Sequence, residues 1–195
     1  MEGVCALSTL PPPGSVPSRL TPHVSRLYLS CHTSSGGNVG LMGAVAEAAA
    51  AAGAPVTGVI PAALVPREIS GATVGERVIV PDMHSRKKTM YEAADAFIAL
   101  PGGFGTLEEI IEMVTWHQLG YHSKPVAFLN VAGFYDRLLS FFDHASAEGF
   151  MLPGVRGIVL AGCDPAGVLD ALQTYERSSP PVFQPEAALT TEELS

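Results

Sequence analysis

The sequence predicts an α/β protein with a parallel sheet and helices on both faces. From about residue 40 onward, short runs of β-branched and aliphatic residues alternate with helical stretches. This alternation is typical of strand–helix units on a parallel sheet. Glycine-containing segments lie where strands lead into helices, at 36–43 and 102–105. With 195 residues, the chain can bury one substantial core, so we expect a single folded domain.

The expected elements alternate along the chain. Strands are predicted at 56–60, 78–80, 96–100, 126–130 and 158–160. Helices are predicted at 43–52, 83–94, 106–119 and 134–148, and a last one opens at Asp164 or Pro165 and runs to about Arg177. The helices at 43–52, 106–119 and 134–148 are each followed by a glycine, a common helix C-cap. The domain is expected at 36–177, after a divergent, poorly ordered segment at 1–35 and before a flexible tail at 178–195.

Composition and charge exclude several classes of protein. The formal charge of −8 argues against a general nucleic-acid binder, although one local pocket can still hold a small anion. No apolar run approaches the roughly 20 residues of a membrane span, and prolines interrupt the N-terminal segment, which makes it a poor secretion signal. Cys5, Cys31 and Cys163 lack the spacing of a zinc site or a disulfide framework, so we expect reduced thiols and a cytoplasmic protein.

The segment Pro101 to Glu109, PGGFGTLEE, is the strongest candidate for a binding site. Its glycines allow a sharp turn at a strand end, and the helix that follows offers free N–H groups to an anion. Thr106 and Glu109 also have the spacing of a capping box, which alone would explain Thr106. The capping box does not explain the three preceding glycines or the neighbouring carboxylate Glu108, and these favour the interpretation of the segment as a ligand-binding site.

A second candidate lies in the segment MHSRKKTM. Met83, Arg86, Lys87 and Met90 have the spacing of one helical stripe, so two cations share a face with core methionines. Either these cations extend their charged ends into water, or they converge on an anion, for which the forked guanidinium of Arg86 is better suited. Lys88 lies off the stripe and is expected in solvent.

Two further side chains are candidates for the same site. Glu68 follows the strand predicted at 56–60, where a carboxylate could reach ribose hydroxyls. Thr115 shares a helix face with Glu108, and its hydroxyl either lines the pocket or bonds the backbone of its own helix. The histidines at 84, 117, 122 and 144 show no metal-ligand spacing and are expected on the surface or in helix packing.

Several segments of the chain together resemble the Lonely Guy family, over about residues 36 to 176. They are PGGFGTLEE, MHSRKKTM, VGLMGAVAEA, GVIPAAL and TWHQLG with KPVAFLNVAGFYDRLL. The resemblance implies a Rossmann-like fold, a homodimer or larger assembly, and a cytoplasmic location, with the nucleus as a second one. It also implies a phosphoribohydrolase that converts cytokinin riboside 5'-monophosphates to free-base cytokinin and ribose 5-phosphate. Neither a metal nor an organic cofactor is implied, and no nucleic acid or membrane is expected as a partner.

The family's PGGxGTxxE motif corresponds to Pro101 to Glu109, and its paired basic residues to Arg86 and Lys87. The resemblance implies substrate contacts from Glu68, Arg86, Lys87, Gly102, Gly103, Phe104, Gly105, Thr106, Leu107, Glu108 and Thr115. Positive charge develops on the ribose during N-glycosidic cleavage, and a carboxylate can stabilise it and orient water, a role that we assign to Glu109. Arg86 would hold the substrate beside it, and the amides of 102–106 would bind the 5'-phosphate.

The beginning of the chain departs from the family pattern. Family members start with a strand–turn–helix unit and a second strand, whereas here SRLYLSCHTSSGGN retains only a remnant of that second strand. The first strand–helix unit is therefore expected to be missing or replaced. This leaves open a nucleotide-binding but catalytically inactive truncated paralogue. A third interpretation, a pyridoxal-phosphate lysine decarboxylase, ranks last, because none of Lys87, Lys88 and Lys124 has a recognisable cofactor-binding context.

Overall fold

A computed structural model of the chain describes residues 3–8, 26–31, 40–65, 74–151 and 154–176. The candidate residue Glu68, the glycines at 36 and 37, and the predicted tail at 178–195 lie outside the described residues. None of the helices in the described ranges combines the length and apolar character that a membrane crossing requires.

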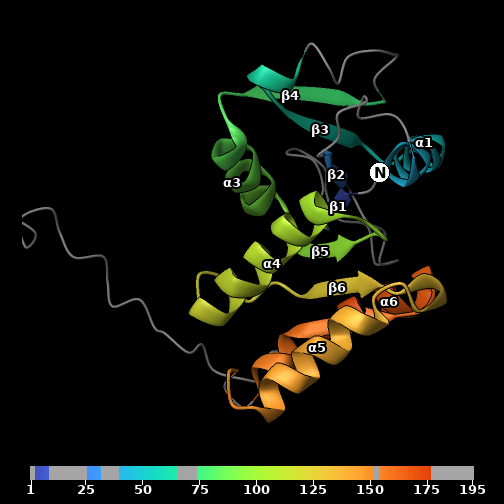
Figure 1. The fold of residues 1–195 in the computed structure, drawn as a ribbon. Coiled ribbons are helices and arrows are strands. Elements are labelled where there is room, and N and C mark those ends of the chain that lie inside the picture. The colour runs from blue at the N-terminus through green and yellow to red at the C-terminus, as the bar shows by residue number, and fades with distance from the viewer. Residues whose placement is uncertain (1–2, 9–25, 32–39, 66–73, 152–153, 177–195) are drawn as a thin grey trace, which may run out of the picture.

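A seven-stranded sheet forms the centre of the protein, with the strand order β4-β3-β2-β1-β5-β6-β7. Figure 1 shows β4 at the top of this sheet and β6 near the bottom. The strands are β1 (Gly3–Ser8), β2 (Arg26–Cys31), β3 (Val56–Pro61), β4 (Glu76–Val80), β5 (Ala96–Ala99), β6 (Val126–Leu129) and β7 (Val159–Gly162).

Helices connect the parallel strands, as the alternating pattern predicts. The α-helices are α1 (Leu41–Ala51), α3 (Met83–Ala93), α4 (Phe104–Leu119), α5 (Asp136–Ala147) and α6 (Pro165–Gln173). Short 3₁₀ helices are η1 (Ala62–Leu64), η2 (Val131–Gly133) and η3 (Val155–Ile158). The predicted α/β class, the five predicted strands and the five predicted helices are confirmed. The last strand begins one residue later than predicted because η3 includes Ile158.

Among the described strands, β1 alone runs against the direction of the others. It lies between β2 and β5 and runs antiparallel to both, with Val4 opposite Ser30 on one side and Ala99 on the other. The remaining strand pairs are parallel. The predicted remnant strand is β2, and an antiparallel strand occupies the place next to β5. Thus two segments of the region 1–35 form the middle of the sheet, while the predicted poor order of the rest of that region stays a prediction.

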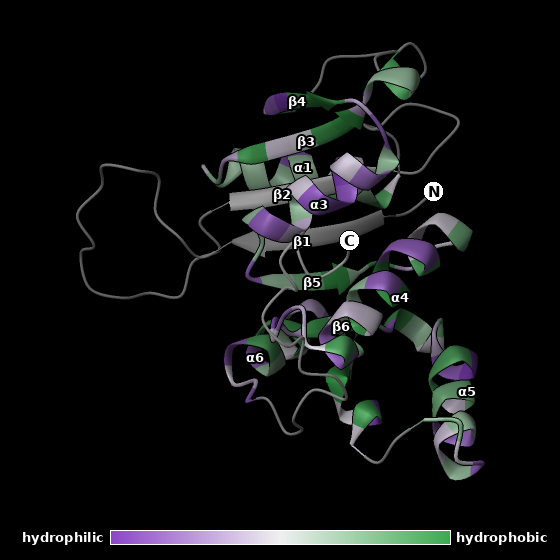
Figure 2. Ribbon diagram, turned by 90° about the vertical axis from the view of Figure 1, so that its left-hand side faces the viewer, coloured by the Kyte–Doolittle hydropathy of each residue, from purple (hydrophilic) through white to green (hydrophobic). Residues whose placement is uncertain are grey.

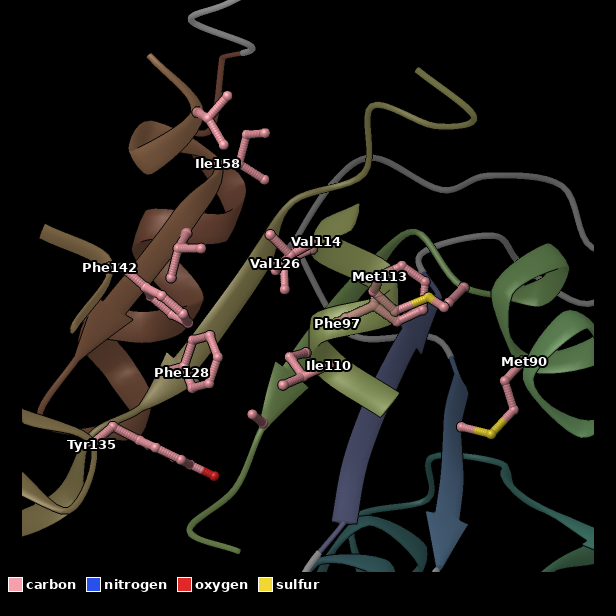
Figure 3. Packing of buried hydrophobic residues seen from close by; sticks show 14 of the residues in the cluster. Met90, Phe97, Ile110, Met113, Val114, Val126, Phe128, Tyr135, Phe142 and Ile158 are labelled. Carbon is pink, nitrogen blue, oxygen red and sulfur yellow. The ribbon is translucent and has the colours of Figure 1, made fainter. Parts of the chain in front are cut away.

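Helices cover both faces of the sheet, and each face has its own core. In β5 the side chains alternate, so that Phe97 and Ala99 join one cluster while Ala96 and Ile98 join the other. The first cluster includes residues of α3, α4 and α5, among them Met90, Ile110 and Phe142, and Figure 3 shows their packing. The second includes Met42 and Ala46 of α1 and Val168 of α6. Figure 2 shows the hydrophobic strands β3 and β5 in green, and much of α3 in purple.

The first core brings α3 and α4 together over the middle of the sheet. Helix α3 follows the edge strand β4 and contacts β4, β3, β2 and β1, whereas α4 contacts β1, β5 and β6. The two helices therefore meet over the central strands, and ion pairs described below connect them. Because α4 begins directly after β5, its N-terminus lies at the carboxyl end of that strand, where ligands bind in sheets of this kind.

Candidate active site

Arg86 is fully buried in the first half of α3, with an exposed fraction of 0%. The helix begins at Met83, and the side chain of its N-cap Asp82 accepts a hydrogen bond from the backbone N–H of Ser85 at 2.7 Å. This cap lowers the pKa of Asp82, since the hydrogen bond favours its charged form. The cap thus fixes the turn of helix from which Arg86 extends.

Glu109 is the counter-charge of Arg86. It lies in the second turn of α4 and is 4% exposed, and its Oε1 lies 4.0 Å from Nη2 of Arg86. A guanidinium taken out of water carries a large desolvation cost unless an opposite charge compensates it. The sequence predicted both residues, from different motifs, and the structure brings them together at the contact between α3 and α4.

The N-terminus of α4 differs from the predicted capping box. Gly103 is the N-cap and provides no side-chain hydrogen bond, and Thr106 is the third residue of the helix rather than its cap. The capping-box interpretation of Thr106 is therefore wrong, because the helix begins at Phe104, two residues earlier than predicted. The first N–H groups of a helix have no partner within it, so the turn presents backbone donors at the end of β5.

Thr106 is buried as well, with an exposed fraction of 1%. Its Oγ1 has no hydrogen-bond partner among the residues that the structure describes. Buried hydroxyls in proteins are nearly always hydrogen-bonded. The Thr106 hydroxyl and the α4 N-terminus therefore both offer polar groups that a bound ligand could engage.

Lys87 bridges α3 and α4 on the more exposed side of the Arg86–Glu109 pair. Its Nζ lies 2.5 Å from Oε1 of Glu108 and 2.7 Å from Oε2 of Glu112. Desolvation lowers the pKa of Lys87, but the hydrogen bonds and charges of these two carboxylates outweigh it, and the net effect raises the pKa above its ordinary value of 10.5. Glu112 was not among the residues predicted for the site, although its spacing of four residues from Glu108 places both on one helix face.

The other predicted residues have varied surroundings. Thr115 is exposed, and its hydroxyl donates a hydrogen bond to the carbonyl of Ile111 at 2.8 Å. Of the two predicted alternatives, this is the one in which the hydroxyl bonds the backbone of its own helix. Leu107 packs against the first core. Phe104, by contrast, is 93% exposed at the first position of α4. An aromatic ring of this size is normally buried. The exposed Phe104 ring, beside the glycine turn, is therefore available for contact with a ligand.

The histidines of α4 and the following loop have a packing role, as the sequence predicts. His117 and His122 are buried, and their rings lie 5.3 Å apart. Nδ1 of His117 lies 3.0 Å from the carbonyl of Lys124, and Nε2 of His122 lies 2.9 Å from the carbonyl of Met113. These contacts occupy the C-terminal end of α4, opposite the end that carries the glycine turn.

The fold and this site define an α/β protein with an uncapped glycine-rich strand-to-helix turn beside a buried arginine–glutamate pair. The family described as "Possible lysine decarboxylase" matches residues 42–172, and the chain belongs to this family. The predicted resemblance to the Lonely Guy proteins is confirmed by its relatives, as follows.

Three relatives show the extent of the similarity. The chain is 54% identical over 143 residues to the probable cytokinin riboside 5'-monophosphate phosphoribohydrolase LOGL1 of Oryza sativa subsp. japonica, covering 73% of this chain and 64% of the relative. It is 53% identical over 141 residues to LOG7 of Arabidopsis thaliana, covering 72% and 65%, and 52% identical over 140 residues to LOG1 of that species, covering 72% and 66%. Both are named cytokinin riboside 5'-monophosphate phosphoribohydrolases. The chain thus spans just under two thirds of the length of these relatives.

Proposed function

We propose that this chain is a phosphoribohydrolase that cleaves the N-glycosidic bond of cytokinin riboside 5'-monophosphates. The products are the free-base cytokinin and ribose 5-phosphate. The buried Arg86–Glu109 pair beside the uncapped N-terminus of α4 is the observation that carries this proposal. The activity for which the three relatives are named supports the same reaction.

The 5'-phosphate binds at the start of α4. Backbone amides of Gly103 to Thr106 donate to its oxygens, and the positive end of the helix dipole adds to the attraction. The Thr106 hydroxyl supplies a further donor, which gives this buried group a partner. Gly102, Gly103 and Gly105 lack side chains that would keep the phosphate away from the backbone.

Glu109 acts at the ribose. As the bond between C1' and the base nitrogen breaks, positive charge develops on the sugar, and the carboxylate stabilises it. The water oxygen bonds to C1', and one of its protons passes to Glu109. The departing base then takes up this proton, directly or through solvent, which restores the carboxylate. Arg86 holds the Glu109 carboxylate in place at the site through the ion pair between their buried side chains.

The remaining predicted residues contact or support the substrate. Phe104 offers an exposed aromatic face on which a purine base can stack. Lys87 and Glu108 join α3 to α4 at the edge of the pocket. Leu107, Thr115 and Glu68 complete the predicted substrate-binding set, Glu68 from outside the described residues. We also propose a cytoplasmic homodimer or larger assembly, with the nucleus as a second location, from the same resemblance.

The lysines do not fit the cofactor chemistry of a lysine decarboxylase, which needs a lysine that forms a Schiff base with pyridoxal phosphate. A Schiff base forms from a neutral amine, whereas Glu108 and Glu112 raise the pKa of Lys87 and so hold it protonated. Burial lowers the pKa of Lys124, but this lysine follows the C-terminal end of α4, far along the chain from the glycine turn, and donates to the carbonyl of Tyr91. Lys88 is exposed and pairs with Glu92 on the surface.

Incubation of the purified protein with isopentenyladenosine 5'-monophosphate tests the proposal. Free isopentenyladenine and ribose 5-phosphate should appear in equal amounts, and the corresponding nucleoside should react far more slowly because it lacks the phosphate. Glu109→Gln should lower kcat by roughly 10²- to 10⁴-fold while it retains nucleotide binding. The matched control Glu92→Gln changes a surface carboxylate of α3 and should leave kcat unchanged. If the wild-type protein releases no base from the nucleotide, hydrolysis is ruled out for this chain.

One observation favours a second candidate, a nucleotide-binding protein without turnover. The antiparallel β1 occupies the place next to β5, so the chain leaving β1 departs from the edge of the sheet opposite the glycine turn. A parallel strand at that place would instead lead into a loop beside the turn. This candidate predicts nucleotide binding by calorimetry with no release of base, and equal affinities for the wild-type protein and Glu109→Gln.

A further inference from the structure

The carbonyl of Leu100 lies at the point where β5 becomes the glycine turn. The pairing of β5 with β1 and with β6 ends at Ala99, one residue before Leu100. Leu100 is buried, and Pro101 follows it and carries no N–H. A buried carbonyl needs a hydrogen-bond donor, and the direction of this carbonyl determines how the chain enters the turn.

Tyr135 supplies that donor. Its hydroxyl donates to the Leu100 carbonyl at 2.5 Å, across 35 residues of sequence. The side chain is 2% exposed, and its ring packs edge-to-face against Phe128 at 4.8 Å and against Phe134 at 4.9 Å. Figure 3 shows the Tyr135 ring beside Phe128, with the hydroxyl pointing away from the backbone that carries it.

Asn130 fixes the backbone of Tyr135 in turn. The N–H of Tyr135 donates to Oδ1 of Asn130 at 2.7 Å, and Nδ2 of Asn130 donates to Asp136 at 2.8 Å. The N–H of Asn130 donates to the carbonyl of Gly162, at the end of β7, also at 2.7 Å. The tyrosine hydroxyl is therefore held by a chain of contacts from the sheet, which leaves it little freedom to move away from Leu100.

We propose that Tyr135 is a positioning residue for the glycine turn: its hydroxyl orients the Leu100 carbonyl and thereby sets the turn at 101–105 in the geometry that receives an anion. Tyr135 itself does not contact the ligand. A displacement of the turn by a fraction of an ångström would misalign the α4 amides, because hydrogen bonds weaken steeply with poor geometry. The inference about catalysis rests on the proposed function, whereas the inference about the geometry of the turn does not.

Tyr135→Phe tests this proposal because it removes only the hydroxyl and keeps the ring. Tyr91→Phe is the matched control: the Tyr91 hydroxyl also donates to a carbonyl, that of Tyr121 at 3.0 Å, but at the far end of α4. Three quantities are measured for each full-length variant: backbone amide chemical shifts of Gly102, Gly103 and Gly105, affinity for inorganic phosphate, and KM and kcat for the nucleotide. Melting temperatures are compared in parallel.

Tyr135→Phe should shift the three glycine amides, weaken phosphate binding by roughly 3- to 10-fold, the equivalent of one lost hydrogen bond, and raise KM more than it lowers kcat. Tyr91→Phe should change none of these even where its melting temperature falls equally. Unchanged glycine amides in Tyr135→Phe would overturn the proposal. If the wild-type protein releases no base, the proposed function fails, but the amide shifts still decide this inference.

A second variant protects the test if Tyr135→Phe does not fold. Asp136→Ala removes the exposed acceptor that holds Asn130, and so loosens Tyr135 without altering the core. It should shift the same glycine amides in the same direction by a smaller amount. Glycine amides identical to those of the wild-type protein in Asp136→Ala would contradict the proposed path from Asn130 through Tyr135 to the turn.

Discussion

Arg86 and Glu109 each depend on the other because both side chains are buried. Removal of one partner leaves a charge in a site of low polarity, which costs far more than the loss of a surface ion pair. The pair therefore has two roles, since it connects α3 to α4 and holds a carboxylate at the proposed site of reaction.

Arg86→Met should destabilise the protein by about 3 to 5 kcal/mol, because the Glu109 carboxylate then lacks its counter-charge. The double variant Arg86→Met with Glu109→Gln should recover part of this loss, as it removes the isolated charge. Urea unfolding followed by circular dichroism measures both values. If the loss in free energy of unfolding of the double variant equals the sum of the losses of the two single variants, the two side chains do not interact.

Phe104 provides a prediction about binding that is separate from stability. Base stacking on an aromatic ring is worth about 1 to 3 kcal/mol, so Phe104→Ala should raise KM for the nucleotide roughly 5- to 100-fold. Its melting temperature should not fall, because the ring is exposed. Phe150→Ala, at a similarly exposed phenylalanine beyond α5, is the control and should leave KM unchanged. Equal KM values in the two variants would remove Phe104 from the site.

At the level of residues, the sequence predicted Arg86 and Glu109 as members of one site, and the structure places them side by side, whereas the capping-box alternative for Thr106 is wrong. Helical spacing placed Arg86 on an apolar stripe, where a cation needs a counter-charge, whereas the role of Glu109 came from the resemblance to the family motif. The position of the helix N-cap depends on where β5 stops pairing, which the glycines of the turn do not specify. The Tyr135 contact with Leu100 could not be predicted either, since it joins residues from different loops.

Between elements, Lys87 joins α3 to α4, two helices that follow different strands, as the Arg86–Glu109 pair also does. Its ammonium contacts two carboxylates on α4, one turn apart. Lys87 is partly buried, so solvent screens these contacts less than those of a fully exposed pair, although Glu108 is itself about half exposed. The register of α3 against α4, and hence of Arg86 against Glu109, depends on this bridge.

Lys87→Met should therefore lower the free energy of unfolding by about 1 to 2 kcal/mol at neutral pH. Lys88→Met, one position further along, removes only an exposed pair with Glu92 at 3.9 Å and should have an effect near zero. Differential scanning calorimetry of the two variants gives the comparison. Equal effects of the two substitutions would show that the bridge adds nothing beyond surface charge.

The same bridge predicts an alkaline limit of stability. The pKa of Lys87 in the folded protein is raised above its ordinary value of 10.5. Its contribution is therefore complete below about pH 10.5 and is lost as the pH rises through the folded-state pKa. The stability difference between the wild-type protein and Lys87→Met should shrink over that range when measured by urea unfolding. A difference that stays constant with pH would contradict the predicted linkage.

At the scale of the whole molecule, β1 joins two halves of the sheet. The half with β2, β3 and β4 and the half with β5, β6 and β7 are both paired to it. The parallel part of the sheet could be predicted because each strand and its helix are neighbours in sequence. The direction of β1 could not, because a short apolar run does not specify which distant strand it pairs with or in which sense.

Ala6→Pro tests the joining role of β1. Ala6 lies opposite Tyr28 on β2 and Phe97 on β5, and proline removes an N–H from a strand that has neighbours on both sides. We expect a loss of about 3 kcal/mol or more in the free energy of unfolding. Ala62→Pro is the control, since proline is tolerated at the first position of a helical turn and Ala62 begins η1. A stable Ala6→Pro variant would show that the two halves hold together without β1.

The place of β1 in the sheet also has a consequence for how the protein is made. β1 precedes every other described strand, yet one of its two partners, β5, follows only after β2, β3, β4 and the described helices α1 and α3. Until β5 emerges from the ribosome, a hairpin of β1 and β2 would present an unpaired edge. Contacts between distant segments form slowly, and open strand edges promote aggregation. The yield of soluble protein should therefore depend on synthesis rate and on chaperones. This dependence should be stronger than for a protein whose paired strands are all neighbours in sequence.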